Sequence, residues 1–103
     1  MFVRLTFISI QPERTEELRK TYQKDVVPVV KNQKGNMGVR LLEPTAINDD
    51  FISVTEWETA ADADLYESSG TYRTLVDKIK EMYKSKPVLK TYNVLESKVA
   101  ATM

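Results

Sequence analysis

Residues 2–10 read FVRLTFISI, and their pattern constrains the whole fold. The segment is rich in β-branched and aromatic residues, which favour an extended strand. Because side chains alternate across a strand, apolar groups fall on both faces. One face carries Val3, Leu5 and Phe7, and the other carries Phe2, Ile8 and Ile10 together with Arg4 and Thr6. A strand with one face in water should alternate cleanly, so this strand is predicted to be covered on both sides.

A helix and a hairpin are predicted to follow this strand. Pro12-Glu13 is typical of a helix start, and Pro28 predicts a kink or a break near Val27. Residues 37–43 and 51–58 form two strands of a hairpin across a polar turn. The apolar stripe of the helix consists of Leu18, Tyr22, Val26, Val29 and Val30.

The second half of the chain repeats the alternation of helix and strand. Thr59-Ala60-Ala61-Asp62 has the spacing of a capped helix start, and this short helix should reach about Glu67. A second helix carries an apolar stripe from Tyr72 to Tyr83, and residues 88–96 form the last strand. This order predicts an α+β, ferredoxin-like split βαβ fold, with an antiparallel sheet and both helices on one face.

Helices on one face alone would leave the other face of the sheet bare. Since the strand at residues 2–10 is apolar on both sides, we predict that a second copy of the chain covers that face. The resulting homodimer should bury about 2,000 Å² or more in total. We expect a single domain over residues 1–97 and a short C-terminal tail over residues 98–103.

The composition excludes several classes of function. The 103 residues include no His and no Cys, which removes the Ser-His-Asp triad, imidazole ligation of haem and thiolate nucleophiles. The formal net charge is zero, which argues against a nucleic-acid partner. No apolar run approaches the roughly 20 residues of a membrane span, and the first residues do not form a signal peptide. A cytoplasmic protein with no membrane partner is expected.

The segment Glu56-Trp57-Glu58-Thr59 carries a resemblance to a known family. An acid, a Trp, a second acid and a capping Thr close the strand, an Ala-rich short helix follows, and Ser68-Ser69-Gly70-Thr71-Tyr72 leads into the next helix. This pattern resembles the antibiotic biosynthesis monooxygenase (ABM) domain over about residues 2–96. The resemblance implies a dimeric α+β barrel, with a pocket between sheet and helices in each subunit.

The resemblance also implies a reaction. It points to a cofactor-independent monooxygenase that oxidises a small aromatic, a quinol or polyketide-type phenol, with molecular oxygen. The substrate supplies the electrons, so the protein need only deprotonate the phenol, stabilise the anion and exclude water. Many members carry His after the Trp, whereas this chain has none, which argues against haem degradation through a proximal His. We therefore expect no flavin, haem or bound metal.

Two residues are the catalytic candidates. Tyr66 stands where the resemblance places a His and could donate a hydrogen bond to a phenolate. Arg40 could hold the developing oxyanion, or it could form a structural ion pair with Glu56. A non-catalytic ligand-binding or interaction module on the same scaffold is the alternative to an enzyme.

The substrate-binding candidates are Trp57, Tyr72, Tyr22 and Glu56. Trp57 could form a pocket wall with its N–H facing the ligand, or it could be a core aromatic. Tyr22 and Tyr72 lie on apolar helical stripes, so core packing is an alternative for both. The acidic residues Asp49, Asp50, Asp62 and Asp64 are interpreted as solvated side chains of a turn and a helix cap, and no metal site is predicted.

Overall fold

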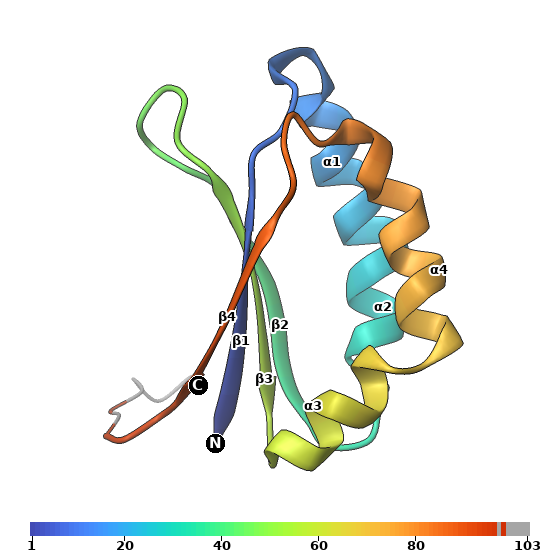
Figure 1. The fold of residues 1–103 in the computed structure, drawn as a ribbon, viewed down its shortest axis with the longest axis vertical. Coiled ribbons are helices and arrows are strands. Elements are labelled where there is room, and N and C mark those ends of the chain that lie inside the picture. The colour runs from blue at the N-terminus through green and yellow to red at the C-terminus, as the bar shows by residue number, and fades with distance from the viewer. Residues whose placement is uncertain (97, 99–103) are drawn as a thin grey trace, which may run out of the picture.

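A four-stranded antiparallel sheet with its helices on one face makes up the fold (Figure 1). The computed structural model describes residues 1–96 and residue 98. The strands lie in the order β2-β3-β1-β4, and every neighbouring pair is antiparallel. The predicted ferredoxin-like α+β fold is therefore confirmed. The strands are β1 (Phe2–Ile8), β2 (Asn36–Leu42), β3 (Phe51–Trp57) and β4 (Val88–Asn93).

The boundaries differ from prediction at the C-terminal end. The last strand was expected over 88–96 but ends at Asn93. The expected domain boundary at residue 97 and most of the expected tail, residues 99–103, lie outside the described residues. None of the helices in the described part of the chain is long and apolar enough to cross a bilayer.

The first helical segment runs past Pro28 without breaking. A proline cannot donate to the carbonyl of the preceding turn, and here a π-helical turn with wider hydrogen-bond spacing directly precedes the proline-containing turn. The predicted interruption near Val27 is thus a change of hydrogen-bonding pattern. In order, the segment comprises η1 (Pro12–Arg14), α1 (Thr15–Thr21), η2 (Tyr22–Val26) and α2 (Val27–Val30).

Side-chain caps fix the starts of the two later helices. The backbone N–H of Asp62 donates to Thr59 Oγ1 at 3.1 Å, as predicted. A second cap, in which the Tyr72 N–H donates to Ser69 Oγ at 3.2 Å, begins the next helix. These caps join two helices through a very short turn and bring Tyr66 close to Tyr72. The helices are α3 (Ala60–Glu67) and α4 (Gly70–Ile79), and η3 (Lys80–Met82) extends the second.

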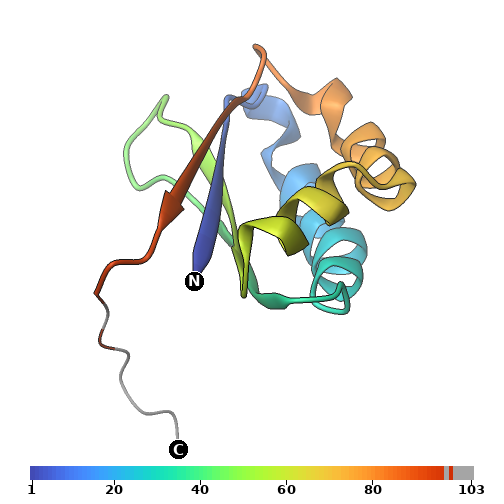
Figure 2. The same cartoon turned by 60° about the horizontal axis from the view of Figure 1, so that its bottom comes forward.

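The sheet has one face against the helices and one bare face in this single chain. Figures 1 and 2 both show the helices on one side of the sheet. The bare face carries Arg40, Glu56 and Lys90, but beside them one row of paired residues crosses all four strands with no polar member. That row comprises Leu42, Ile52, Phe7 and Val88.

Candidate active site between the helices and the sheet

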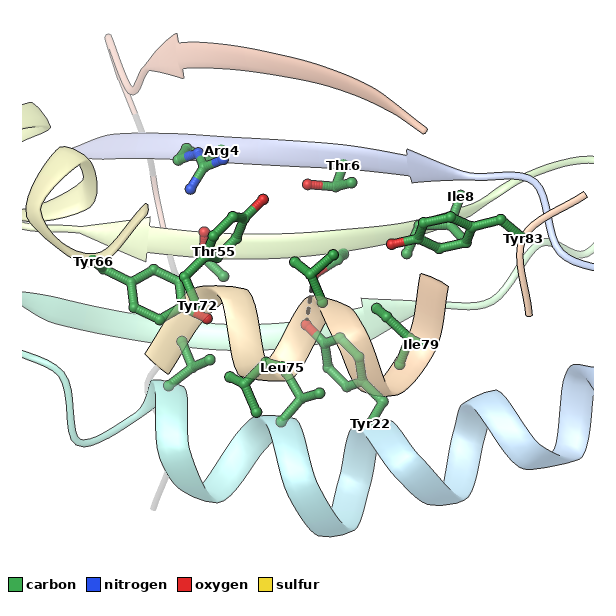
Figure 3. A pocket seen from close by; sticks show the side chains of 14 residues that line it. Arg4, Thr6, Ile8, Tyr22, Thr55, Tyr66, Tyr72, Leu75, Ile79 and Tyr83 are labelled. Carbon is green, nitrogen blue, oxygen red and sulfur yellow. Dashed lines mark hydrogen bonds between the residues drawn. The ribbon is translucent and has the colours of Figure 1, made fainter. Parts of the chain in front are cut away.

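A cavity lies between the sheet and the helical layer (Figure 3). The volume open to the centre of a water-sized sphere is about 70 Å³, several times the roughly 10–15 Å³ that a single water needs. The alternation of β1 directs Arg4, Thr6 and Ile8 into it, and β3 contributes Ser53 and Thr55. The helices supply aliphatic side chains and the rings of several tyrosines. The walls are thus apolar with a few hydroxyl groups.

Tyr22 lines the cavity from η2, and hydrogen bonds to the sheet hold its hydroxyl. Its hydroxyl lies 2.8 Å from Ser53 Oγ and donates to the Arg40 carbonyl at 3.1 Å. Burial raises the pKa of Tyr22 to about 12, and the hydrogen bond with Ser53 opposes this shift. The predicted pocket position of Tyr22 is thus observed, with its hydroxyl already engaged by the protein.

Tyr66 and Tyr72 form one wall of the cavity. The Tyr66 ring stacks on Trp57 at 5.2 Å between centroids and meets the edge of Tyr72 at 5.3 Å. Burial raises the pKa of Tyr66, with smaller contributions from neighbouring groups. Tyr66 therefore stays protonated near neutral pH, as a hydrogen-bond donor rather than a base. In the described part of the chain its hydroxyl has no hydrogen-bond partner, so it is available to a ligand.

Arg4 is the charged residue of this cavity, and sequence reasoning did not select it. Its side chain is 4% exposed, and its Nη2 lies 3.2 Å from Glu67 Oε1. The guanidinium carbon lies 5.6 Å from the centroid of the Tyr72 ring. Arg4 Nε is buried and has no hydrogen-bond partner among the described residues. The sequence did hold a signal for this role: Arg4 shares one face with Thr6 and Ile8 on a strand that is apolar on both faces.

The structure does not bring Arg40 and Glu56 to the cavity. Val39 and Leu41 pack into the core, and alternation therefore turns Arg40 to the bare face of the sheet. There its Nη2 pairs with Glu56 Oε1 at 2.7 Å. The predicted ion pair is present, whereas the placement of both residues in the pocket is wrong.

Trp57 packs against the ring of Tyr66 and is not itself among the residues that line the cavity. Its side chain is 0% exposed, and its Nε1 donates to Thr55 Oγ1 at 2.9 Å. The indole N–H is therefore not directed at a ligand, and the prediction that it faces one is wrong. The alternative prediction, a core aromatic, holds. The stack on Tyr66 makes Trp57 the residue that fixes the orientation of that ring.

The acidic pairs selected from the sequence form no metal site in the described part of the chain. No group of three or more potential ligands comes together in residues 1–96 and 98. Asp49 and Asp50 lie in the turn before β3, and Asp62 lies in the first turn of α3. They have the positions expected of turn and cap residues.

Alkaline pH should destabilise the protein through its buried tyrosines. An unfolded tyrosine ionises near pH 10, whereas Tyr22 in the folded chain ionises near 12. Between these values the unfolded state releases a proton that the folded state keeps, so stability falls as pH rises. Tyr22 alone should cost about 3 kcal/mol across this interval.

Urea unfolding from about pH 9 to about pH 12 measures this loss. Tyr22→Phe should flatten the alkaline decline, although it also removes the contact with Ser53. An alkaline decline that is equally steep in wild type and Tyr22→Phe would contradict the assignment.

The fold and the cavity define a class of protein: a ferredoxin-like α+β domain with a mostly apolar cavity between its sheet and its helices. The sequence model of the family "Antibiotic biosynthesis monooxygenase" matches residues 1–78. The chain belongs to this family, and the resemblance found in the sequence is confirmed.

Solved structures of similar fold include several proteins of this name. One from Nitrosomonas europaea, named for this family, has 19% identity and a TM-score of 0.81, over 93% of this chain and 100% of its own. Another from Deinococcus radiodurans has 13% identity and a TM-score of 0.81, over 99% and 100%. A mutant of MhuD with two manganese protoporphyrin IX molecules per active site has 19% identity and a TM-score of 0.82, over 97% and 100%. No curated protein matches in sequence. At these identities the structures share the fold alone.

The residues of this cavity do not fit a porphyrin with an axial protein ligand. The chain contains no His or Cys. The hydroxyl of Tyr22 is already engaged by Ser53 and the Arg40 carbonyl. The described lining thus offers no imidazole or thiolate as an axial ligand, and no step of the chemistry below involves such a group.

Proposed function

We propose that this protein is a cofactor-independent monooxygenase that oxidises a small aromatic, a quinol or polyketide-type phenol, with molecular oxygen. The observation that carries the proposal is the juxtaposition of a buried guanidinium and a free tyrosine hydroxyl in an apolar cavity. Membership of the antibiotic biosynthesis monooxygenase family supports the reaction class.

The chemistry follows from the groups that line the cavity. Tyr66 and Arg4 offer hydrogen bonds to an oxygen that gains negative charge, in a site with little water to compete. This stabilises the ionised, electron-rich form of the substrate, which can give electrons to oxygen. For a phenol oxidised to a quinone, one oxygen atom enters the ring, and the other leaves as water with two hydrogens, one from the oxidised carbon and one from the phenol hydroxyl. The protein orients the substrate, stabilises the anion and excludes bulk water.

We also propose that the protein works as a homodimer with the bare sheet faces packed together. The apolar row across the sheet supports this arrangement, because its members Leu42 and Val88 are exposed in the single chain and contiguous exposed apolar side chains mark interaction surfaces. A dimer would cover that face and leave the cavity in place, because the cavity lies on the helical side of the sheet.

Tyr66→Phe should reduce turnover about 100-fold and leave the melting temperature nearly unchanged. Removal of one oxyanion donor typically costs about 3 kcal/mol in the transition state. Oxygen uptake with a panel of hydroquinones and anthrones, corrected for autoxidation without protein, measures the effect. Tyr92→Phe, the same substitution on the bare face of the sheet, should keep full activity.

The same measurement separates the enzyme from the alternative, a non-catalytic binding module. A binding module would take up no oxygen above the protein-free rate with any substrate of the panel, even where calorimetry shows binding. Activity that is equal in wild type and Tyr66→Phe would remove Tyr66 from the catalytic site.

A further inference from the structure

We propose that the cavity selects an anionic aromatic ligand, whose carboxylate or phenolate oxygen accepts a hydrogen bond from the buried Nε of Arg4. This inference rests on the proposed function in that it names the substrate class for the same cavity. It assigns Arg4 as the residue that determines specificity.

The first argument is the unsatisfied donor. Arg4 is 4% exposed, and its Nε is buried with no partner among the described residues. A buried donor that lacks a partner costs free energy, more so when it is charged. Arg4 Nε is the one buried side-chain atom in the described part of the chain with this deficit. A ligand oxygen at this position would remove the deficit.

The second argument is that Glu67 leaves Arg4 only partly neutralised. Its Oε1 lies 3.2 Å from Nη2 on one side of the guanidinium, and its side chain is 38% exposed. An arginine has five N–H donors in a planar fork, and Glu67 lies beside Nη2, so the buried Nε donor is left without an acceptor within the part of the chain that the structure describes. The solvent around Glu67 also weakens its attraction for the guanidinium.

The third argument is the character of the remaining walls. Among the described residues that line the cavity, Arg4 is the only charged one. Thr6 and Thr55 contribute hydroxyls, and Leu75 and Ile79 contribute apolar surface. In Figure 3, Arg4 and Thr6 extend from β1 on the sheet side of the cavity, opposite Leu75 on α4. Such a site fits a flat apolar ring with one anionic oxygen at its Arg4 end.

Calorimetric titration with two matched pairs of ligands tests the proposal. The carboxylate pair is 2-naphthoate and its neutral isostere 2-naphthamide. The phenolate pair is 2,4-dinitro-1-naphthol, which is ionised near neutral pH, and its methyl ether. Wild type should bind at least one anion roughly 10- to 100-fold more tightly than its neutral partner. The pair with the larger preference identifies the carboxylate or the phenolate as the natural group.

Three variants test whether Arg4, and not another part of the protein, causes the preference for the anion. Arg4→Gln should abolish the preference for the anion and change 2-naphthamide binding by less than about 3-fold. Glu67→Gln, at a partly exposed position, should strengthen anion binding because it removes a competing negative charge. Arg73→Gln removes a guanidinium from the exposed side of α4 and should leave the preference intact. Thermal unfolding verifies that each variant is folded.

The outcomes separate this inference from the proposed function. Arg4-dependent anion binding without oxygen uptake supports the inference and contradicts the proposed function. Oxygen uptake on neutral substrates that is unchanged in Arg4→Gln supports the monooxygenase reaction, removes Arg4 from it and overturns the inference. Equal affinity for the anionic and the neutral member of both pairs would overturn the inference. Failure of every probe to bind would also overturn it. If Arg4→Gln does not fold, weaker anion binding by Glu67→Gln would overturn it.

Discussion

Ile52→Asp should convert the proposed homodimer into monomers. Ile52 pairs with Leu42 on one side and Phe7 on the other, in the apolar row on the bare face of the sheet. A twofold interface would bury this carboxylate once in each subunit among apolar side chains, since the nearby Arg40 is already paired with Glu56 and Lys90 lies over the Phe7 ring. Each unpaired buried charge costs about 3–5 kcal/mol, so the dimer Kd should rise by roughly four orders of magnitude or more.

Light scattering at micromolar concentration measures the mass of each variant. Leu65→Asp is the matched control, because Leu65 lies on α3 in the helical layer and is 60% exposed; it should remain dimeric. A monomeric wild type would contradict the proposed assembly, and so would an Ile52→Asp protein that stays dimeric at the same concentration.

Trp57→Ala should lower the free energy of unfolding by about 3–5 kcal/mol. The side chain is fully buried at the end of β3, stacks on Tyr66 and donates to Thr55. The substitution leaves a cavity and removes the support of the Tyr66 ring. Because a domain of this kind is stable by only about 5–15 kcal/mol, a substantial unfolded population at moderate temperature is expected.

Urea unfolding of wild type, Trp57→Ala and Trp57→Phe measures the effect. Trp57→Phe retains an aromatic ring against Tyr66 and should be less destabilising than Trp57→Ala, while both lose the hydrogen bond to Thr55. A Trp57→Ala protein destabilised by less than about 1 kcal/mol would show that the indole is not a principal packing element.

The order of strands and helices could be predicted because the signals for it are local. The alternation in residues 2–10 shows a strand with two apolar faces, and Thr59 with Asp62 shows the start of α3. Both signals depend on backbone geometry and on neighbours within a few residues. The interruption at Pro28 was also local, although only the structure shows that a π-helical turn accommodates it.

The candidate site could be predicted only in part, because alternation along a strand does not say which face is the inner one. Arg40 was assigned to the cavity, but its flanking residues Val39 and Leu41 turn inward and Arg40 faces out. The sequence also leaves open which face of the sheet Arg4 is on, because β1 is apolar on both sides. In the structure Arg4 pairs with Thr55, which lines the cavity, and so Arg4 is on the inner face.

The tyrosines were easier to predict, since each falls on a helix face that the apolar stripe or the helix junction directs towards the sheet. Tyr22, Tyr66 and Tyr72 all line the cavity as expected. Trp57 was correctly placed at the end of its strand, yet its N–H direction depends on Thr55 two residues earlier. Periodicity alone does not reveal such a hydrogen bond.

The proposed monooxygenase should insert one oxygen atom from molecular oxygen into an aromatic substrate. Incubation with anthrone under oxygen-18 gas, followed by mass spectrometry of the quinone, tests this reaction. One oxygen-18 atom is expected in the product, formed at a rate that depends on the protein and falls about 100-fold in Tyr66→Phe. A product formed no faster than without protein, or one labelled only from oxygen-18 water, would contradict it.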